Sequence, residues 1–207
     1  IAIGHLFVES EFYNTRVISL AGPQAKKPRL VKTIIGASVA ELTEGEIVAS
    51  SQGVRVISGT VLWGNTAVGP YAYLGRYHQG VALLEEGTKN EFFLKNWMGL
   101  GIHRHSATRA FLANFIHPST YTFNTALNGG PRSIMPIGCY EKVLAPYGVE
   151  ATMLVRAIDI NDTDQAKLLG ILEFSEEDIA LATYVCPGKN DFGPLLRRSL
   201  TKIEVEG

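Results

Sequence analysis

Length and charge set the first limits on this protein. The chain has 207 residues, of which 46% are apolar, enough to fill the core of one large domain or two modest ones. Its 19 basic and 20 acidic residues give a formal net charge of −1, and this balance creates no electrostatic preference for nucleic acid.

The ends and the cysteines of the chain indicate its context. No apolar run approaches the roughly 20 residues that span a bilayer, and no signal-peptide pattern is present, so we expect no transmembrane segment. The chain begins at Ile1 inside the apolar stretch IAIGHLFV, and we expect it to be a fragment of a longer protein. Cys139 and Cys186 are too few for a disulfide framework, which suits a reducing compartment.

The first half is predicted to be rich in strands. β-branched residues in partial alternation, bounded by Gly and Pro, predict strands at residues 15–22, 29–36 and 54–63, with further edges from YAYLGRYH (71–78) and QGVALLEEG (79–87). Ser38 and Glu41 have the spacing of a capping box, which predicts a short helix that ends at Gly45. This order of strands and helix predicts a β-grasp domain over residues 10–88, and a small barrel is the alternative.

The periodicity changes near residue 90, and a helical domain is predicted over residues 90–207, so that the fold class is α+β. Apolar residues at helical spacing predict a first helix over residues 106–116, ended by Pro118. Cap residues and apolar spacing predict four more helices, in 138–146, 149–158, 162–170 and 175–185. A last helix is predicted to start at Pro194, a residue suited to the first helical position.

The motif Cys186-Pro187 raises the question of an iron–sulfur cluster. A ferredoxin-type site needs four cysteines in the spacing C-x₂-C-x₂-C-x₃-C-P, because the thiolates must converge on the cluster from one loop. Counting back from Cys186, the other ligand positions hold Ala182, Ile179 and Glu176. Three of the four thiolates are therefore missing, and we expect Cys186 to be a packed residue at a helix-to-loop corner.

Two other segments carry weaker signals for ion binding. His103 and His105 form an H-x-H pair, but no acidic residue or thiol follows closely, so a solvated loop is favoured over a metal site. The turn-rich stretch NTALNGGPRS (124–133) could present backbone N–H groups to an anion beside Arg132. It lacks the lysine and spacing of a nucleotide-binding loop.

Aromatic residues interleaved with glycine in WGNTAVGPYAYLGRYHQG are the candidates for a ligand groove. The candidate residues there are Tyr71, Tyr73, Arg76, Tyr77 and His78. The same pattern can close a small sheet without binding anything, and closure is the favoured interpretation. The acidic run at residues 176–178 is interpreted as a helix N-terminus, where negative charge is stabilised. No catalytic triad, activated cysteine or paired carboxylates are recognised, so we expect no catalytic, cofactor-binding or metal site within this chain alone.

Five long stretches resemble one known family. These are RVISLAGPQAKKPRLVKTIIGAS, RVISGTVLWGNTAVGPYAYLGRYH, FNTALNGGPRSIMPIGCYEKVL, DTDQAKLLGILEFSEEDIALATYVCPGK and FGPLLRRSLTKIEVEG. The chain is similar in them to the C-terminal half of the NqrA subunits of Na⁺-translocating NADH:quinone oxidoreductases. The resemblance covers essentially the whole chain, apart from the H-x-H stretch at residues 103–105.

The resemblance implies a peripheral subunit on the cytoplasmic face of the bacterial inner membrane. The six-subunit complex would reduce ubiquinone with NADH and export Na⁺, using flavins and iron–sulfur centres held elsewhere. The membrane subunit NqrB would be the main partner, and ubiquinone contact is allowed. The resemblance also implies a soluble-ligand-binding β-grasp (SLBB) domain followed by a helical domain like that of related iron–sulfur subunits, without the cluster.

Two functions follow from these observations. The first is a structural and docking module of a redox pump, which is not catalytic by itself. The second is a stand-alone β-grasp module that binds a small ligand through the aromatic segment. A docking module should expose an apolar or charged interface patch and bind no small molecule tightly on its own.

Overall fold

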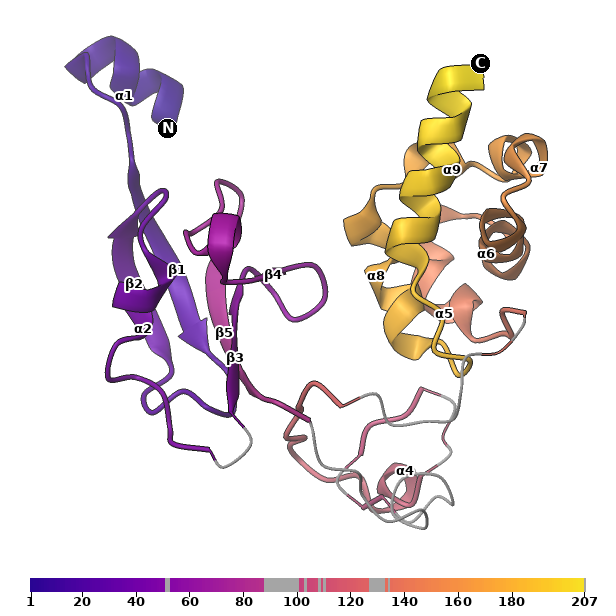
Figure 1. Ribbon diagram of the computed structural model, residues 1–207, viewed down its shortest axis with the longest axis horizontal. Helices are drawn as coiled ribbons and strands as arrows, with labels where there is room; N and C mark the ends of the chain where they lie inside the picture. Colours follow the sequence, from indigo (N-terminus) through magenta and orange to yellow (C-terminus); the bar gives the residue numbers. More distant parts are fainter. Residues whose placement is uncertain are drawn as a thin grey trace. The chain divides into compact units, whose positions relative to one another are not determined.

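The computed structural model describes most of the chain, in residues 1–50, 53–87, 101–102, 104–107, 109, 111–126, 133 and 135–206. The chain divides into two compact units (Figure 1). The first contains residues 1–89 and 123–126, and the second contains residues 90–122 and 127–207.

A five-stranded sheet forms the first unit. Its strands are β1 (Thr15–Ala21), β2 (Arg29–Ile34), β3 (Val54–Ser58), β4 (Asn65–Thr66) and β5 (Gly80–Glu85). Their order in the sheet is β2-β1-β5-β3-β4. β1 and β5 are parallel, with Leu20 opposite Val81, and the other neighbouring pairs are antiparallel. The chain therefore places its first and last strands side by side in the middle of the sheet.

One face of this sheet carries the core of the unit. Along β1, Ile18 and Leu20 are buried while Val17 and Ser19 are exposed, as the two-residue period of a strand requires. The helix α2 (Val39–Thr43) packs on the buried face through Val39. Its cap is the predicted one, because the Ser38 side chain accepts a hydrogen bond from the backbone N–H of Glu41.

Two predicted strands differ from the structure. The third ends at Ser58 rather than near residue 63, because Gly59 has a φ of 107° and the chain then turns. The stretch 71–78 is not a strand: the 3₁₀ helix η1 (Gly69–Tyr71) opens it, and turns follow. The helix α1 (Ala2–Glu9), at the start of the chain, was not predicted from the sequence.

Helices make up the regular structure described in the second unit. They are α4 (Ala113–Ile116), α5 (Tyr140–Leu144), η2 (Ala145–Tyr147), α6 (Ala151–Ile160), α7 (Thr163–Leu168), η3 (Ile171–Glu173), α8 (Glu176–Val185) and α9 (Phe192–Glu206). The predicted caps of two of them are confirmed. Asp162 caps α7, and Ser175 forms a capping box with Asp178 at the start of α8.

Two helix boundaries differ from the predictions. The helix predicted over 106–116 is confined, among the residues described there, to α4, because Arg109 takes a left-handed φ of 57°. The last helix begins at Phe192 rather than Pro194, so the proline is its third residue. Pro194 still lies within the first turn, where backbone N–H groups have no partner inside the helix.

Buried side chains of α5, α6, α8 and α9 form a separate core in the second unit. Tyr140, Leu154, Ile158, Ile179 and Phe192 are fully buried in it. The rings of Tyr140 and Phe192 meet edge to face, with centroids 5.5 Å apart. Each unit therefore has its own core. Within the residues that the structure describes, no helix combines the length and apolar character needed to cross a membrane.

Candidate functional site

The aromatic candidates lie on one loop of the first unit, residues 70–78, which we call the tyrosine loop. Tyr71, Tyr73 and Tyr77 are all exposed, and Tyr77 is 81% exposed. Arg76 is exposed beside them, and His78 is half-buried. The structure thus brings the five residues onto one loop, with three phenol rings accessible to a partner.

The tyrosine loop is held against the sheet by its alternate residues. Leu74 is 3% exposed and packs in the core of the unit. Its backbone N–H donates to the Ala37 carbonyl at 2.8 Å, and the N–H of Val39 donates to the Ala72 carbonyl at 3.0 Å. Because these bonds fix the loop to the start of α2, the neighbouring tyrosines are presented without a large loss of loop entropy on binding.

His78 closes the tyrosine loop from inside. Its Nδ1 is 2.8 Å from the Ser58 hydroxyl, and its ring lies 5.8 Å from the ring of Trp63, centroid to centroid. The ring also packs on Gly75, where a Cβ would lie 2.6 Å from Nδ1. Gly75 is therefore required by close approach, and His78 acts as a structural clasp in this arrangement.

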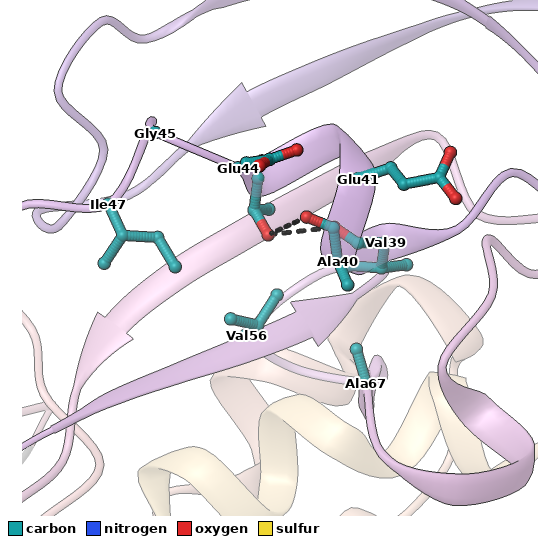
Figure 2. Close-up of a pocket in the computed structure, with 9 residues that line it drawn as sticks. Val39, Ala40, Glu41, Glu44, Gly45, Ile47, Val56 and Ala67 are labelled. Carbon is teal, nitrogen blue, oxygen red and sulfur yellow. Dashed lines mark hydrogen bonds between the residues drawn. The ribbon is translucent and has the colours of Figure 1, made fainter.

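A groove lies elsewhere in the same unit, beside α2 (Figure 2). Its volume is about 500 Å³, and its lining residues are Val39, Ala40, Glu41, Thr43, Glu44, Gly45, Ile47, Val56 and Ala67. No residue of the tyrosine loop lines it. The groove was not predicted from the sequence, because its walls come from a helix, a strand and two loops that meet only in the folded chain.

The chemistry of the groove is apolar with acidic residues at α2. Val39, Ile47 and Val56 supply apolar side chains, and Glu41 and Glu44 supply carboxylates (Figure 2). The Thr43 hydroxyl donates back to the carbonyls of α2, at 2.9 Å to Val39 and 3.2 Å to Ala40. This hydroxyl is satisfied within the helix, so what the groove offers a ligand is mainly apolar contact.

A second hollow, of about 420 Å³, lies in the helical unit. Met135 and Met153 line it together with Arg156, whose Nε donates to the Pro136 carbonyl at 3.1 Å. The aliphatic side chain of Ile160, 73% exposed, stands at this hollow. Flexible methionine side chains adapt to irregular apolar partners, so the hollow suits a protein contact better than a polar ligand.

Cys186 lies at the packed corner expected from the sequence. It ends α8 and is 1% exposed, and its Sγ is hydrogen-bonded to the Tyr140 hydroxyl at 3.1 Å. The backbone N–H of Asn190 donates to the same sulfur at 3.4 Å. Burial raises the pKa of Tyr140 well above its usual value, and the bond to Cys186 adds to this shift.

The residues around Cys186 do not fit an iron–sulfur cluster. Ile179 and Ala182 stand at two of the ligand positions, are fully buried in the core, and carry no donor atom. The third position, Glu176, accepts a hydrogen bond from Arg197 Nε at 2.7 Å. Arg197 is the first cause of the lowered pKa of Glu176, so this carboxylate is committed to an ion pair.

The remaining signals for ion binding are only partly within the described residues. His103 and Arg132 fall outside them. His105 is described, and its Nδ1 is 2.7 Å from the Tyr184 hydroxyl, with its ring stacked on that of Tyr184. Among the described residues, no group of three or more His, Cys, Asp or Glu side chains is arranged to hold a metal ion.

A family model and curated relatives match this chain. Residues 17–69 match the model described as the NQRA C-terminal domain. That match covers β1 to β4, together with α2 and the groove.

Three relatives are each named as the NqrA component of a Na(+)-translocating NADH-quinone reductase. The chain is 51% identical to the protein of Histophilus somni (strain 2336), and 50% identical to those of Vibrio alginolyticus and Pasteurella multocida (strain Pm70). Each match covers all 207 residues of this chain and 45% of the relative. The chain thus spans a little under half the length of these relatives, and the resemblance seen in the sequence is confirmed.

Proposed function

We propose that this chain, which is similar over its whole length to part of the NqrA proteins of Na⁺-translocating NADH:quinone reductases, forms the C-terminal part of such a protein in a bacterial membrane complex. The observation that carries the proposal is about 50% identity over all 207 residues. A similarity of this extent includes both cores and both units, so it is not a match of one motif.

In this proposal the complex is the enzyme. It reduces ubiquinone to ubiquinol with NADH and exports Na⁺, and its flavins and iron–sulfur centres are held in other subunits. The 207 residues form a structural and docking module without a catalytic residue of its own. The Cys186 corner supports this role, because side chains without metal-binding atoms fill two of the positions at which related domains hold cluster ligands.

We assign the first unit to the soluble-ligand-binding β-grasp folds. The order β2-β1-β5-β3-β4, with parallel central strands and α2 on the buried face, supports the assignment. We assign the second unit, in which all helices from α5 to α9 contribute to one core, to the all-α domains that follow it in related redox subunits. In this assignment the domains are residues 10–88 and 90–207.

The partners in this proposal are the other subunits of the complex, above all the membrane subunit NqrB, at the cytoplasmic face of the inner membrane. The tyrosine loop supports a docking role. Tyrosine offers a large rigid contact surface with a polar tip, and it is enriched where proteins bind one another. The rigid attachment of the loop to Leu74 and α2 makes this surface available in one conformation.

Assembly of the complete complex tests the docking role. We expect Tyr77→Ser in the full-length subunit to weaken its capture by tagged NqrB about tenfold, as removal of an interface tyrosine commonly does. Phe115→Ser is the matched control, because Phe115 is 79% exposed and lies in the other unit. Equal capture of Tyr77→Ser and the unchanged protein would exclude the tyrosine loop. Full assembly without residues 1–207 would overturn the docking function itself.

A second candidate function is that of a small-ligand-binding module. The groove beside α2 favours it, since an apolar floor of about 500 Å³ has room for a ring-sized ligand. Titration of the isolated chain with a short-chain ubiquinone, followed by NMR, separates the two functions. We expect no saturable shift at Val56 or Ala67. A saturable shift confined to the groove would make ligand binding, with quinone contact, the better assignment.

A further inference from the structure

The helix α1 is apolar and has no buried residue. Phe7 is 82% exposed and Val8 is 79% exposed, and Ile3 is exposed as well. Soluble proteins seldom leave a contiguous group of large apolar side chains in water. The surface of α1 therefore requires a partner that the two units described here do not supply.

The few polar residues of α1 lie on one side of the helix. His5 and Glu9 are four residues apart and so share a face, while Ile3, Phe7 and Val8 lie on the wide remaining arc. The His5 side faces the chain that follows the helix. Its Nδ1 is 3.0 Å from the Glu11 carbonyl oxygen, and its ring lies 5.4 Å from that of Tyr13.

The orientation of α1 thus directs its apolar arc away from its own unit. A helix of eight residues is too short to be stable in water by itself, because nucleation is costly and few bonds follow it. Its side chains must gain burial from elsewhere, since a helix that is apolar over most of its circumference is normally covered.

The lengths of the relatives indicate what covers this arc. The chain spans 45% of each relative, and its matched family model is a C-terminal domain, so the larger part of those proteins precedes the matched segment. We propose that the apolar arc of α1 docks on the part of the same polypeptide that precedes residue 1. This rests on the proposed function, because it takes the chain to be the C-terminal part of an NqrA protein.

Hydrogen exchange in two lengths of the protein tests the docking of α1. In the 207-residue chain, we expect the amides of Ala2–Glu9 to exchange nearly as fast as in an unstructured peptide. In the full-length subunit, we expect them to exchange about 100-fold more slowly, because exchange then requires release of the helix from its partner. Fast exchange in both forms would overturn the proposal. Slow exchange already in the 207-residue chain would also overturn it, since α1 would then be covered by its own unit.

A pair of matched variants tests the same contact from the side chains. Val8 and Val205 are each 79% exposed and each is the second-last residue of its helix. Lysine near a helix C-terminus is favourable, so Val→Lys does not weaken either helix directly. In the full-length subunit, Val8→Lys should speed exchange at α1 at least about tenfold, whereas Val205→Lys should leave it unchanged. Equal exchange at α1 in the two variants would contradict the docking.

Two further measurements separate this inference from the proposed function. Protection of α1 in the isolated full-length protein, before other subunits are added, assigns the contact to the same polypeptide. Protection that appears only with the membrane subunits, or only with vesicles of anionic phospholipid, would assign α1 to those partners and overturn the inference. Failure of the complex to assemble while α1 stays protected would instead count against the docking function alone.

Discussion

At the scale of single residues, Cys186 shows how a cysteine can be retained in a core without metal chemistry. Its sulfur receives the Asn190 backbone N–H and is hydrogen-bonded to the Tyr140 hydroxyl. These two bonds occupy the sulfur, and the surrounding side chains exclude water. The residue therefore behaves as a small buried hydrophobe that also satisfies two polar neighbours.

We predict that Cys186→Ala lowers the free energy of unfolding of the helical unit by about 1–2 kcal/mol, from lost contacts and an unsatisfied Tyr140 hydroxyl. Urea denaturation followed by far-UV circular dichroism measures this change. Cys139→Ala is the control and should cost less, because Cys139 is only partly buried. In the assembled complex, Cys186→Ala should leave quinone reduction intact. Normal assembly with abolished electron transfer would mean that the sulfur has a redox role.

At the scale of elements, the start of α8 combines a cap with two tertiary contacts. Asp178 accepts from the Ser175 backbone N–H at 2.8 Å and from the Tyr147 hydroxyl at 2.7 Å. The Ser175 side chain is the first cause of the lowered pKa of Asp178, and Tyr147 adds to it. The carboxylate thus holds the helix N-terminus and ties it to η2.

We predict an acid-sensitive contribution from this cap. Because the pKa of Asp178 is lower in the folded state than in the unfolded state, its contribution is present above an ordinary Asp pKa of about 3.9 and is lost as the pH falls below it. Asp178→Asn should therefore lower stability by about 1 kcal/mol at pH 7 and by less at pH 3. Denaturant titrations at the two pH values check this.

The control for the cap prediction is Asp159→Asn, in α6, which the described hydrogen bonds show accepting no backbone N–H through its side chain. A loss of stability for Asp178→Asn that is the same at both pH values would contradict an ionised cap. The result would then indicate that the shape of the side chain, rather than its charge, supports the start of α8.

At the scale of the whole molecule, the chain does not divide at a single point. Residues 123–126 belong to the first unit although they follow residues of the second. The Thr125 hydroxyl donates to Glu86 at 2.6 Å and accepts from the Gly87 backbone N–H at 2.9 Å, and the Thr125 N–H donates to the Glu85 carbonyl at 3.1 Å. The segment therefore extends the end of β5.

We predict that Thr125→Val destabilises the first unit and leaves the helical unit unchanged. The substitution keeps the side-chain volume but removes the hydroxyl that bonds Glu86 and Gly87, so the expected loss is about 1–2 kcal/mol. Residue-resolved hydrogen exchange reports each unit separately, through the amides of β5 and of α9. Thr122→Val, at an exposed position, serves as the control. An equal loss of protection in both units would contradict their separate cores.

The sequence determined the elements whose signals are local. The caps at Ser38, Asp162 and Ser175 were predicted correctly, because a cap depends on side chains within three or four residues of one another. The missing cluster ligands were also readable, since a cluster motif is a matter of spacing. Resemblance over the whole chain then identified the family that the relatives confirm.

The tertiary structure decided what depends on contacts between distant segments. The strand predicted at 71–78 became a loop because Leu74 packs in the core and bonds the start of α2, contacts that no local pattern encodes. The groove beside α2 was missed for the same reason, since its walls meet only after folding. The apolar stretch at the N-terminus was readable in the sequence, but only the structure showed a helix whose large apolar side chains are exposed, because burial depends on which surfaces the rest of the fold supplies.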